Sequence, residues 1–131
     1  MSRVLVIDDQ PELRQLFQRV LENQGYTVTT ADNGQAGLGA LDAADPQLIL
    51  LDMAMPLMDG LAFLRELRKI PRWATLPVII LSGLMSAEQT QTARALGVVD
   101  QLVKAEFSMK ELRARVARHV PSPVPATSVQ R

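Results

Sequence analysis

Residues 47–52 read Gln-Leu-Ile-Leu-Leu-Asp, an apolar run that ends on a carboxylate. A continuous apolar run of this length is typical of a strand covered on both faces, as in a parallel sheet. The chain contains three more apolar runs of this kind and one alternating, β-branched run that fits an edge strand. The five predicted strands span residues 4–7, 26–30, 47–51, 77–81 and 98–103.

Apolar side chains recur with the helical period between and after these strands. The clearest case begins at Pro11, which suits the first position of a helix, and ends before Gly25. Five helices are predicted, over residues 11–23, 35–42, 59–69, 86–96 and 108–120. Strands that alternate with helices five times predict an α/β domain with a parallel sheet and right-handed crossovers.

The composition is that of one ordinary globular domain. The chain has 131 residues, and 47% of them are hydrophobic and 21% charged, which excludes disorder of the whole chain. Fourteen basic residues balance fourteen acidic ones, so the chain lacks the charge excess of a nucleic-acid-binding protein. It has no cysteine and one histidine, His119, which excludes thiolate chemistry and multi-histidine metal sites. We interpret His119 as an exposed cation at a helix end.

The predicted domain covers residues 1–120. Three prolines fall within residues 121–125, and we interpret 121–131 as a Pro-rich flexible tail or the start of a linker. The apolar runs are far shorter than the ~18 residues needed to span a bilayer, and no signal-peptide core opens the chain. We therefore expect a cytoplasmic protein without membrane contact.

Polar side chains follow four of the predicted strands at the point where each strand ends. They are Asp8 and Asp9, Asp52, Ser82, and Lys104. Each alone has an ordinary explanation, since such residues also cap helices, end turns or face solvent. Together they mark one edge of a parallel sheet, because the carboxyl ends of the strands meet there and ligands bind at that edge.

Three carboxylates in one crevice repel each other, which raises their pKa values or recruits a cation. Oxygen ligands with few protein contacts suit Mg²⁺, which keeps several waters and is often shared with a phosphate. Asp52 could then act as a carboxylate nucleophile toward phosphorus and form an aspartyl phosphate. Lys104 would offset charge on the transferring group, and the Ser82 hydroxyl could donate a hydrogen bond to it.

At these residues the chain resembles the receiver domain of bacterial two-component response regulators, in its chemotaxis-type single-domain form. The resemblance covers residues 3–119, and its most specific part is Asp-Met-Ala-Met-Pro-Leu-Met-Asp-Gly at 52–60. It implies a flavodoxin-like, doubly wound, five-stranded parallel sheet of order 2-1-3-4-5 with five helices.

The resemblance also implies roles for single residues. Asp52 would be the phosphoacceptor, and Asp8, Asp9, Asp52 and the backbone carbonyl of Ala54 would bind Mg²⁺. Ser82 and Lys104 would be the switch hydroxyl and the phosphate-binding lysine. The phosphoryl donor would be a phosphohistidine on a sensor histidine kinase or a histidine phosphotransfer protein, and the chain would be a signalling phosphoacceptor rather than an enzyme.

Two departures from the family pattern concern how the switch would pass its signal to an output protein. Gln101 stands where most receivers carry Tyr or Phe, and Lys104-Ala-Glu-Phe107 replaces the usual Lys-Pro-Phe. A cis bond costs ~2.5–4 kcal/mol without proline, so we predict a trans Lys104–Ala105 bond in a longer loop. Phe107 would occupy the packing site of the family's aromatic residue.

The leading interpretation is a stand-alone response regulator whose output face comprises 86–96, 98–103 and 108–120, without direct contact to nucleic acid. A receiver excised from a longer regulator is one alternative, with residues from 121 onward as linker. A Mg²⁺-dependent small-molecule phosphatase or phosphotransferase is an alternative from a different class. A flavodoxin-like cofactor carrier is disfavoured, because three acids repel a phosphate and no phosphate-binding loop follows the first strand.

Overall fold

The computed structural model describes residues 2–123. Strands and helices alternate along them, as the sequence predicts. The strands are β1 (Arg3–Ile7), β2 (Thr27–Ala31), β3 (Leu48–Asp52), β4 (Val78–Ser82) and β5 (Val98–Val103). The helices are α1 (Pro11–Asn23), α2 (Gly34–Ala44), α3 (Gly60–Lys69), the 3₁₀ helix η1 (Pro71–Trp73), α4 (Ala87–Ala95) and α5 (Met109–His119).

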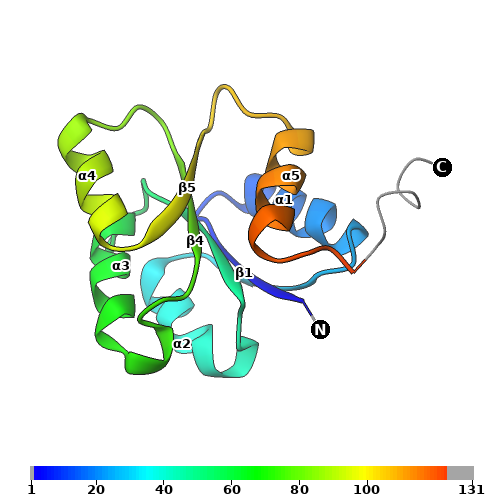
Figure 1. The fold of residues 1–131 in the computed structure, drawn as a ribbon, viewed down its shortest axis with the longest axis horizontal. Coiled ribbons are helices and arrows are strands. Elements are labelled where there is room, and N and C mark those ends of the chain that lie inside the picture. The colour runs from blue at the N-terminus through cyan, green and yellow to red at the C-terminus, as the bar shows by residue number, and fades with distance from the viewer. Residues whose placement is uncertain (1, 124–131) are drawn as a thin grey trace.

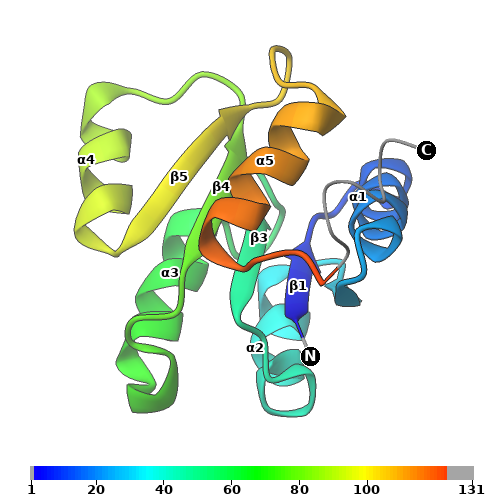
Figure 2. The same cartoon turned by 45° about the vertical axis from the view of Figure 1, so that its right-hand side comes forward.

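All strands pair in parallel in a single sheet of order β2-β1-β3-β4-β5. Helices cover both faces of this sheet: α1 and α5 lie on one side and α2, α3 and α4 on the other (Figure 1). Turning the molecule keeps this separation (Figure 2). The predicted doubly wound, flavodoxin-like fold is confirmed.

The three central strands, β1, β3 and β4, are apolar except at one end residue each (Arg3, Asp52 and Ser82), because both of their faces are covered. In β1, Leu5 and Ile7 pack in the core beneath α2 and α3, whereas Val4 and Val6 pack in the core beneath α1 and α5. The same alternation holds in β3 and β4, where every residue is buried. This rigid centre carries the strand ends at which the polar residues lie.

The prediction that 98–103 is a strand covered on both faces was wrong. β5 is an edge strand, and Leu102 is its only buried residue. Its cover is thin because α4 contributes one buried side chain, Ala93. The short η1 helix was not predicted at all.

The end of α5 is tied to the beginning of the chain. The Tyr26 hydroxyl donates a hydrogen bond to the Val120 carbonyl, and the Ser2 hydroxyl to the Pro121 carbonyl. Residues 124–131 lie outside the described part of the chain, so the predicted tail stays a prediction. Within residues 2–123, no helix has the length and apolar character needed to cross a membrane.

Candidate functional site

Strand pairing brings the predicted site residues together at one edge of the sheet. Asp52 is the last residue of β3, and its neighbour Leu51 pairs with Ile7 of β1. Asp8 follows Ile7 directly and therefore emerges beside Asp52. On the other side of β3, Asp52 pairs with Leu81 of β4, and Ser82 is the next residue.

Asp8, Asp9 and Asp52 form a compact acidic cluster. One carboxylate oxygen from each lies within 4.8 Å of the other two. Asp8 and Asp52 are fully buried. Asp8 Oδ1 accepts a hydrogen bond from the Gln10 amide at 2.9 Å, and Asp52 Oδ1 accepts one from the Ala54 amide at 3.1 Å.

The second oxygen of each buried carboxylate has no hydrogen-bond partner. A buried, unpartnered carboxylate oxygen carries a large desolvation cost. Two such oxygens beside the half-buried Asp9 are the hard, anionic donors that Mg²⁺ prefers. The residues present therefore fit a magnesium ion held by Asp8, Asp9 and Asp52.

Lys104 supplies the only cationic side chain that pairs with the acidic cluster in residues 2–123. Its Nζ lies 3.0 Å from Asp52 Oδ1. The Lys104 amide also donates to the Ser82 carbonyl at 2.7 Å, which fixes the start of the loop after β5. No cis peptide bond occurs in the described residues, so the predicted trans Lys104–Ala105 bond is confirmed. Phe107 packs against Phe17 of α1, with ring centroids 6.0 Å apart.

Burial has the largest effect on the pKa values of the two enclosed carboxyls, those of Asp52 and Asp8. It raises the pKa of Asp52 to about 6, although the hydrogen bonds from Lys104 and the Ala54 amide oppose the shift. Burial also raises the pKa of Asp8, with a further contribution from the charge of Asp9. Asp52 is thus mainly ionised at neutral pH yet poorly solvated, which suits a nucleophilic carboxylate.

Ser82 is buried, and its hydroxyl oxygen has no hydrogen-bond partner. It lines a pocket of about 150 Å³ between the loop after β3 and the loop after β4. Met53 and Ala54 come from the first loop, and Leu84 and Met85 from the second. The hydroxyl is therefore free to donate to a group that enters beside Asp52.

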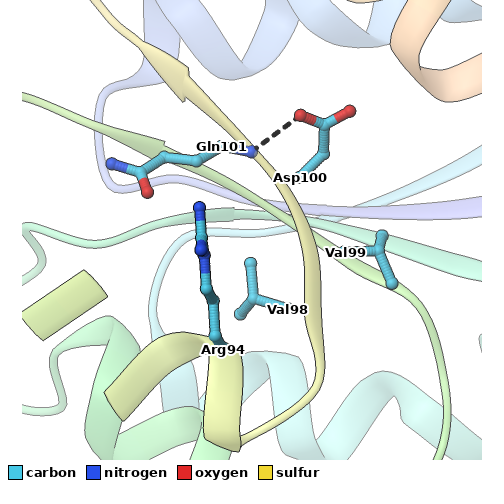
Figure 3. A pocket seen from close by; sticks show the side chains of 5 residues that line it. All are labelled: Arg94, Val98, Val99, Asp100 and Gln101. Atoms are coloured by element: carbon cyan, nitrogen blue, oxygen red, sulfur yellow. Dashed lines mark hydrogen bonds between the residues drawn. The ribbon is translucent and has the colours of Figure 1, made fainter. Parts of the chain in front are cut away.

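Gln101 lies in the wall of a second pocket, at the edge of the sheet. This pocket of about 220 Å³ lies between α4 and β5, with Arg94, Val98, Val99 and Asp100 as its other lining residues. Figure 3 shows the Arg94 side chain rising toward Gln101, while the Asp100 side chain leaves the strand on the other side. The predicted output face thus carries a polar hollow at Gln101, the position for which the family resemblance implies an aromatic ring.

His119 differs from its sequence interpretation as an exposed cation. Its side chain is 21% exposed, and Nε2 is a buried atom without a hydrogen-bond partner, 3.9 Å from Asp100 Oδ2. Asp100 also pairs with Arg115 of α5. His119 is the last residue of α5, and α5 begins just after the Lys104 loop and runs away from it (Figure 2), so His119 lies at the end of the helix that is far from this loop.

Two residues support the site although no role was predicted for them from the sequence. Gly60 follows the loop after β3, and a Cβ there would lie 2.9 Å from Met53 Cα, so this close approach requires glycine. Arg14 of α1 donates to the Asp8 carbonyl at 2.8 Å. The Asp-Gly pair at 59–60 signals a tight approach, whereas nothing in the sequence marks Arg14.

The comparisons with known proteins decide the family. The model of the response regulator receiver domain matches residues 4–117. The chain belongs to this family. It is a receiver domain of two-component response regulators, a family of signalling phosphoacceptors that generally bind Mg²⁺ at an acidic pocket and interact with histidine kinases or phosphotransfer proteins.

Relatives of similar length and of about twice the length both match this receiver. It is 39% identical over 110 residues to the "Uncharacterized 14.6 kDa protein in sodA1 3'region" of Leptolyngbya boryana, covering 84% of each chain. It is 37% identical over 115 residues to the "Probable transcriptional regulator ycf27" of Porphyridium aerugineum, covering 88% of this chain and 46% of that protein. The receiver thus spans about half the length of such regulators.

The solved structures agree with the fold. Chemotaxis protein CheY4 of Vibrio cholerae superposes with a TM-score of 0.85 at 31% identity, covering 91% of this chain and 98% of that one. The receiver domain of the Francisella response regulator 1452 superposes with a TM-score of 0.80 at 35% identity, covering 90% and 95%. The receiver fold therefore accounts for nearly all of the described residues.

Proposed function

We propose that this receiver is a phosphorylation-controlled switch of a two-component phosphorelay, in which Asp52 accepts the phosphoryl group. The donor is a phosphohistidine on a sensor histidine kinase or on a histidine phosphotransfer protein. One observation carries the proposal: a fully buried carboxylate ends the central strand, beside two other carboxylates and 3.0 Å from the Lys104 ammonium.

The chemical step is a transfer between two nucleophiles. An oxygen of the Asp52 carboxylate bonds to phosphorus while the phosphorus–nitrogen bond to the donor imidazole breaks, and the imidazole leaves with that electron pair. Lys104 offsets negative charge that gathers on the phosphoryl oxygens, and the Ser82 hydroxyl donates to one of them. Mg²⁺ bound by Asp8, Asp9, Asp52 and the Ala54 carbonyl would supply further positive charge at this place.

Phosphorylation acts on the chain itself and not on an external substrate. The pocket beside Ser82 measures about 150 Å³, below the usual ~300–1,000 Å³ of small-molecule sites, so it offers little room for a small-molecule substrate. A wider hollow of about 440 Å³ at residues 9–13 has Asp9 in its lining but neither Asp52 nor Ser82. Self-phosphorylation from small donors and self-dephosphorylation complete the cycle. The readout is a change in the surface formed by α4, β5 and α5, which an output protein binds.

Two arrangements of the switch in a larger system remain compatible with the relatives. A stand-alone regulator corresponds to the relative of similar length, and a receiver excised from a longer regulator corresponds to the relatives of about twice the length. We favour the stand-alone switch, with a receiver domain over 1–120. The stop codon of the full gene separates the two.

Intact-mass measurement with Mg²⁺ and acetyl phosphate tests the proposal. We expect a single base-labile adduct of about 80 Da, the mass of one phosphoryl group on a carboxylate. Asp52→Asn should lose the adduct, whereas Asp42→Asn, which removes a surface carboxylate from α2, should keep it. An adduct of wild-type yield on Asp52→Asn would exclude Asp52 as the acceptor.

A further inference from the structure

A break in strand pairing shapes the hollow between α4 and β5. Val98 and Asp100 pair with consecutive residues of β4, so Val99 between them is an extra, unpaired residue. A β-bulge of this kind reverses the alternation of the side chains that follow it. As a result, Asp100 points away from α4, whereas Gln101 lies on the same side of the strand as Val98 and faces α4 (Figure 3).

Asp100 is the acidic residue that lines the hollow, and its charge is already compensated. The carboxylate forms an ion pair with Arg115 of α5 and accepts a hydrogen bond from the Gln101 backbone amide at 3.0 Å. Its side chain is largely buried and leaves the strand on the side away from Arg94 (Figure 3). Asp100 is therefore not the partner of the cation in the hollow.

Arg94 and Gln101 bring free donor groups into this hollow. In the described part of the chain, neither the Arg94 guanidinium nor the Gln101 side-chain amide has a hydrogen bond or an ion pair. Arg94 lies in the last turn of α4, where a cation offsets the helix dipole. The carbonyls just beyond that turn are nevertheless already bound, because Arg68 donates to those of Leu96 and Gly97.

A guanidinium next to a primary amide offers the donors that a carboxylate requires. The guanidinium binds a carboxylate through two parallel N–H groups, and the Gln101 amide can donate to the same oxygens. Val98 lies beside Arg94 (Figure 3) and gives a methylene chain an apolar wall. The volume of about 220 Å³ is below the usual ~300–1,000 Å³ of sites that enclose a whole small molecule, so a single side chain is the fitting occupant.

We propose that the hollow between α4 and β5 binds an acidic side chain, aspartate or glutamate, of a protein partner through Arg94 and Gln101. The half-exposed Val99 gives that partner an apolar contact at the rim. The inference rests on the proposed function in one respect: the hollow lies on the proposed output surface, so the partner would be the output protein. Gln101 and Lys104 belong to one stretch of backbone, so a shift of Lys104 on phosphorylation would alter the hollow.

The test is a peptide titration of the full chain without acetyl phosphate, followed by the backbone amide signals in NMR. The probes are acetyl-Ala-Glu-Ala-amide and its neutral isostere acetyl-Ala-Gln-Ala-amide. We expect the acidic peptide to shift the signals of residues 94–101 with a Kd on the order of 1 mM, since one side chain fills the hollow. The neutral peptide should bind about tenfold more weakly or less, because it lacks the charge-assisted hydrogen bonds.

Three variants separate the hollow from the overall charge. Arg94→Gln should weaken binding of the acidic peptide about tenfold or more, and Gln101→Leu should weaken it severalfold. Arg19→Gln, which removes an exposed arginine from α1 and gives the same net charge as Arg94→Gln, is the matched control and should bind as the wild type does. Arg94 is exposed, so the urea midpoint of Arg94→Gln should equal that of the wild type.

Each contrary result has a distinct meaning. Equal binding of the two peptides, unchanged binding in Arg94→Gln, shifts confined to another part of the chain, or no binding at about ten times the expected Kd would overturn the proposal. Inorganic phosphate that binds through Arg94 as tightly as the acidic peptide would overturn it as well, because the hollow would then be a general anion site. The titration needs no phosphoryl group on Asp52, so a failure of acetyl phosphate labelling would refute the proposed function and leave the titration result standing.

Discussion

Lys104 reaches the Asp52 carboxylate from a loop whose first bond is trans. Its ammonium is a point charge on a flexible stem, and its own amide is already bound to the Ser82 carbonyl. A phosphoryl group on Asp52 would offer this ammonium a stronger partner than the bare carboxylate. Movement of Lys104 would then be passed to β5 through the backbone it shares with that strand.

We therefore expect Lys104→Ala to separate phosphorylation from its structural consequence. The variant should still accept phosphate from acetyl phosphate at Asp52, at a reduced rate. The change in amide-hydrogen exchange over α4 and β5 that follows phosphorylation in the wild type should be lost. Lys110→Ala, which removes a cation from α5, is the control. An exchange response of wild-type size in Lys104→Ala would contradict this role.

Tyr26, far from the acidic cluster, allows a test of how the stability of the fold depends on pH. Burial raises the pKa of this hydroxyl from 10.0 to about 12, because the charged form would lose its solvation in the core. The neutral form donates a hydrogen bond to the Val120 carbonyl. A raised pKa in the folded state gives stability that is complete below pH 10 and lost as the pH rises through about 12. We expect the free energy of unfolding to fall over this interval more steeply in the wild type than in Tyr26→Phe.

Absorbance provides the second readout, since Tyr26 is the sole tyrosine. The tyrosinate signal of the folded protein should have its midpoint near pH 12, and that of the urea-unfolded protein near 10. At neutral pH, Tyr26→Phe should cost about 1 kcal/mol, because the buried Val120 carbonyl loses its donor. A folded-state midpoint near pH 10 would show that the Tyr26 hydroxyl is not buried.

Among the secondary structure elements, α4 depends most on polar anchors. Ala93 is its one buried side chain, and Ser86 and Gln89 close a reciprocal capping box at its beginning. At its end, Arg68 of α3 donates to the Leu96 carbonyl at 2.6 Å, and the same guanidinium donates to the Trp73 carbonyl of η1 at 2.9 Å. An element held in this way can shift without breaking a large apolar core, as a switching element requires.

Removal of the Arg68 anchor should loosen the end of α4 selectively. We expect Arg68→Met to speed amide exchange over residues 87–97 and to lower the free energy of unfolding by about 2 kcal/mol, the scale of charge-assisted hydrogen bonds. Arg65→Met, on the exposed side of α3, is the matched control and should change neither. Unaltered exchange in Arg68→Met would mean that the capping box alone holds α4.

Some secondary structure elements could be predicted from the sequence and others could not. Continuous apolar runs identify β1, β3 and β4 because these strands are covered on both faces, and parallel pairing then places Asp8, Asp52 and Ser82 at one edge. The same reasoning failed for β5, since an apolar run does not reveal whether a helix lies over each face. The backbone of Leu57, in the loop after β3, has a φ of +70°; this conformation has no sequence signal, because leucine is not a residue that favours positive φ.

Across the whole molecule, the two ends of the sheet are built differently. At the end of the sheet away from the site, hydrogen bonds from Ser2 and Tyr26 fasten the chain after α5. At the site end lie three of the four buried side-chain polar atoms without a hydrogen-bond partner in residues 2–123: Asp8 Oδ2, Asp52 Oδ2 and Ser82 Oγ. Such atoms cost stability, and their concentration at one edge is typical of a site that a ligand completes.

Mg²⁺ should therefore stabilise the whole fold, and the acidic cluster should account for the effect. A ligand that binds only the folded state adds about 2.7 kcal/mol at a concentration of one hundred times its Kd, so the urea midpoint of the wild type should rise with Mg²⁺. Asp9→Ala should lose most of this rise, because it removes one of the three clustered carboxylates.

Asp8→Asn should be more stable than the wild type without Mg²⁺, since it removes one buried charge from beside Asp52 and Asp9, and it should respond little to the metal. Asp42→Asn, a surface carboxylate, should respond as the wild type does. An equal rise with Mg²⁺ in Asp9→Ala and the wild type would show that the ion binds elsewhere, and the unpartnered oxygens of Asp8 and Asp52 would need a different ligand.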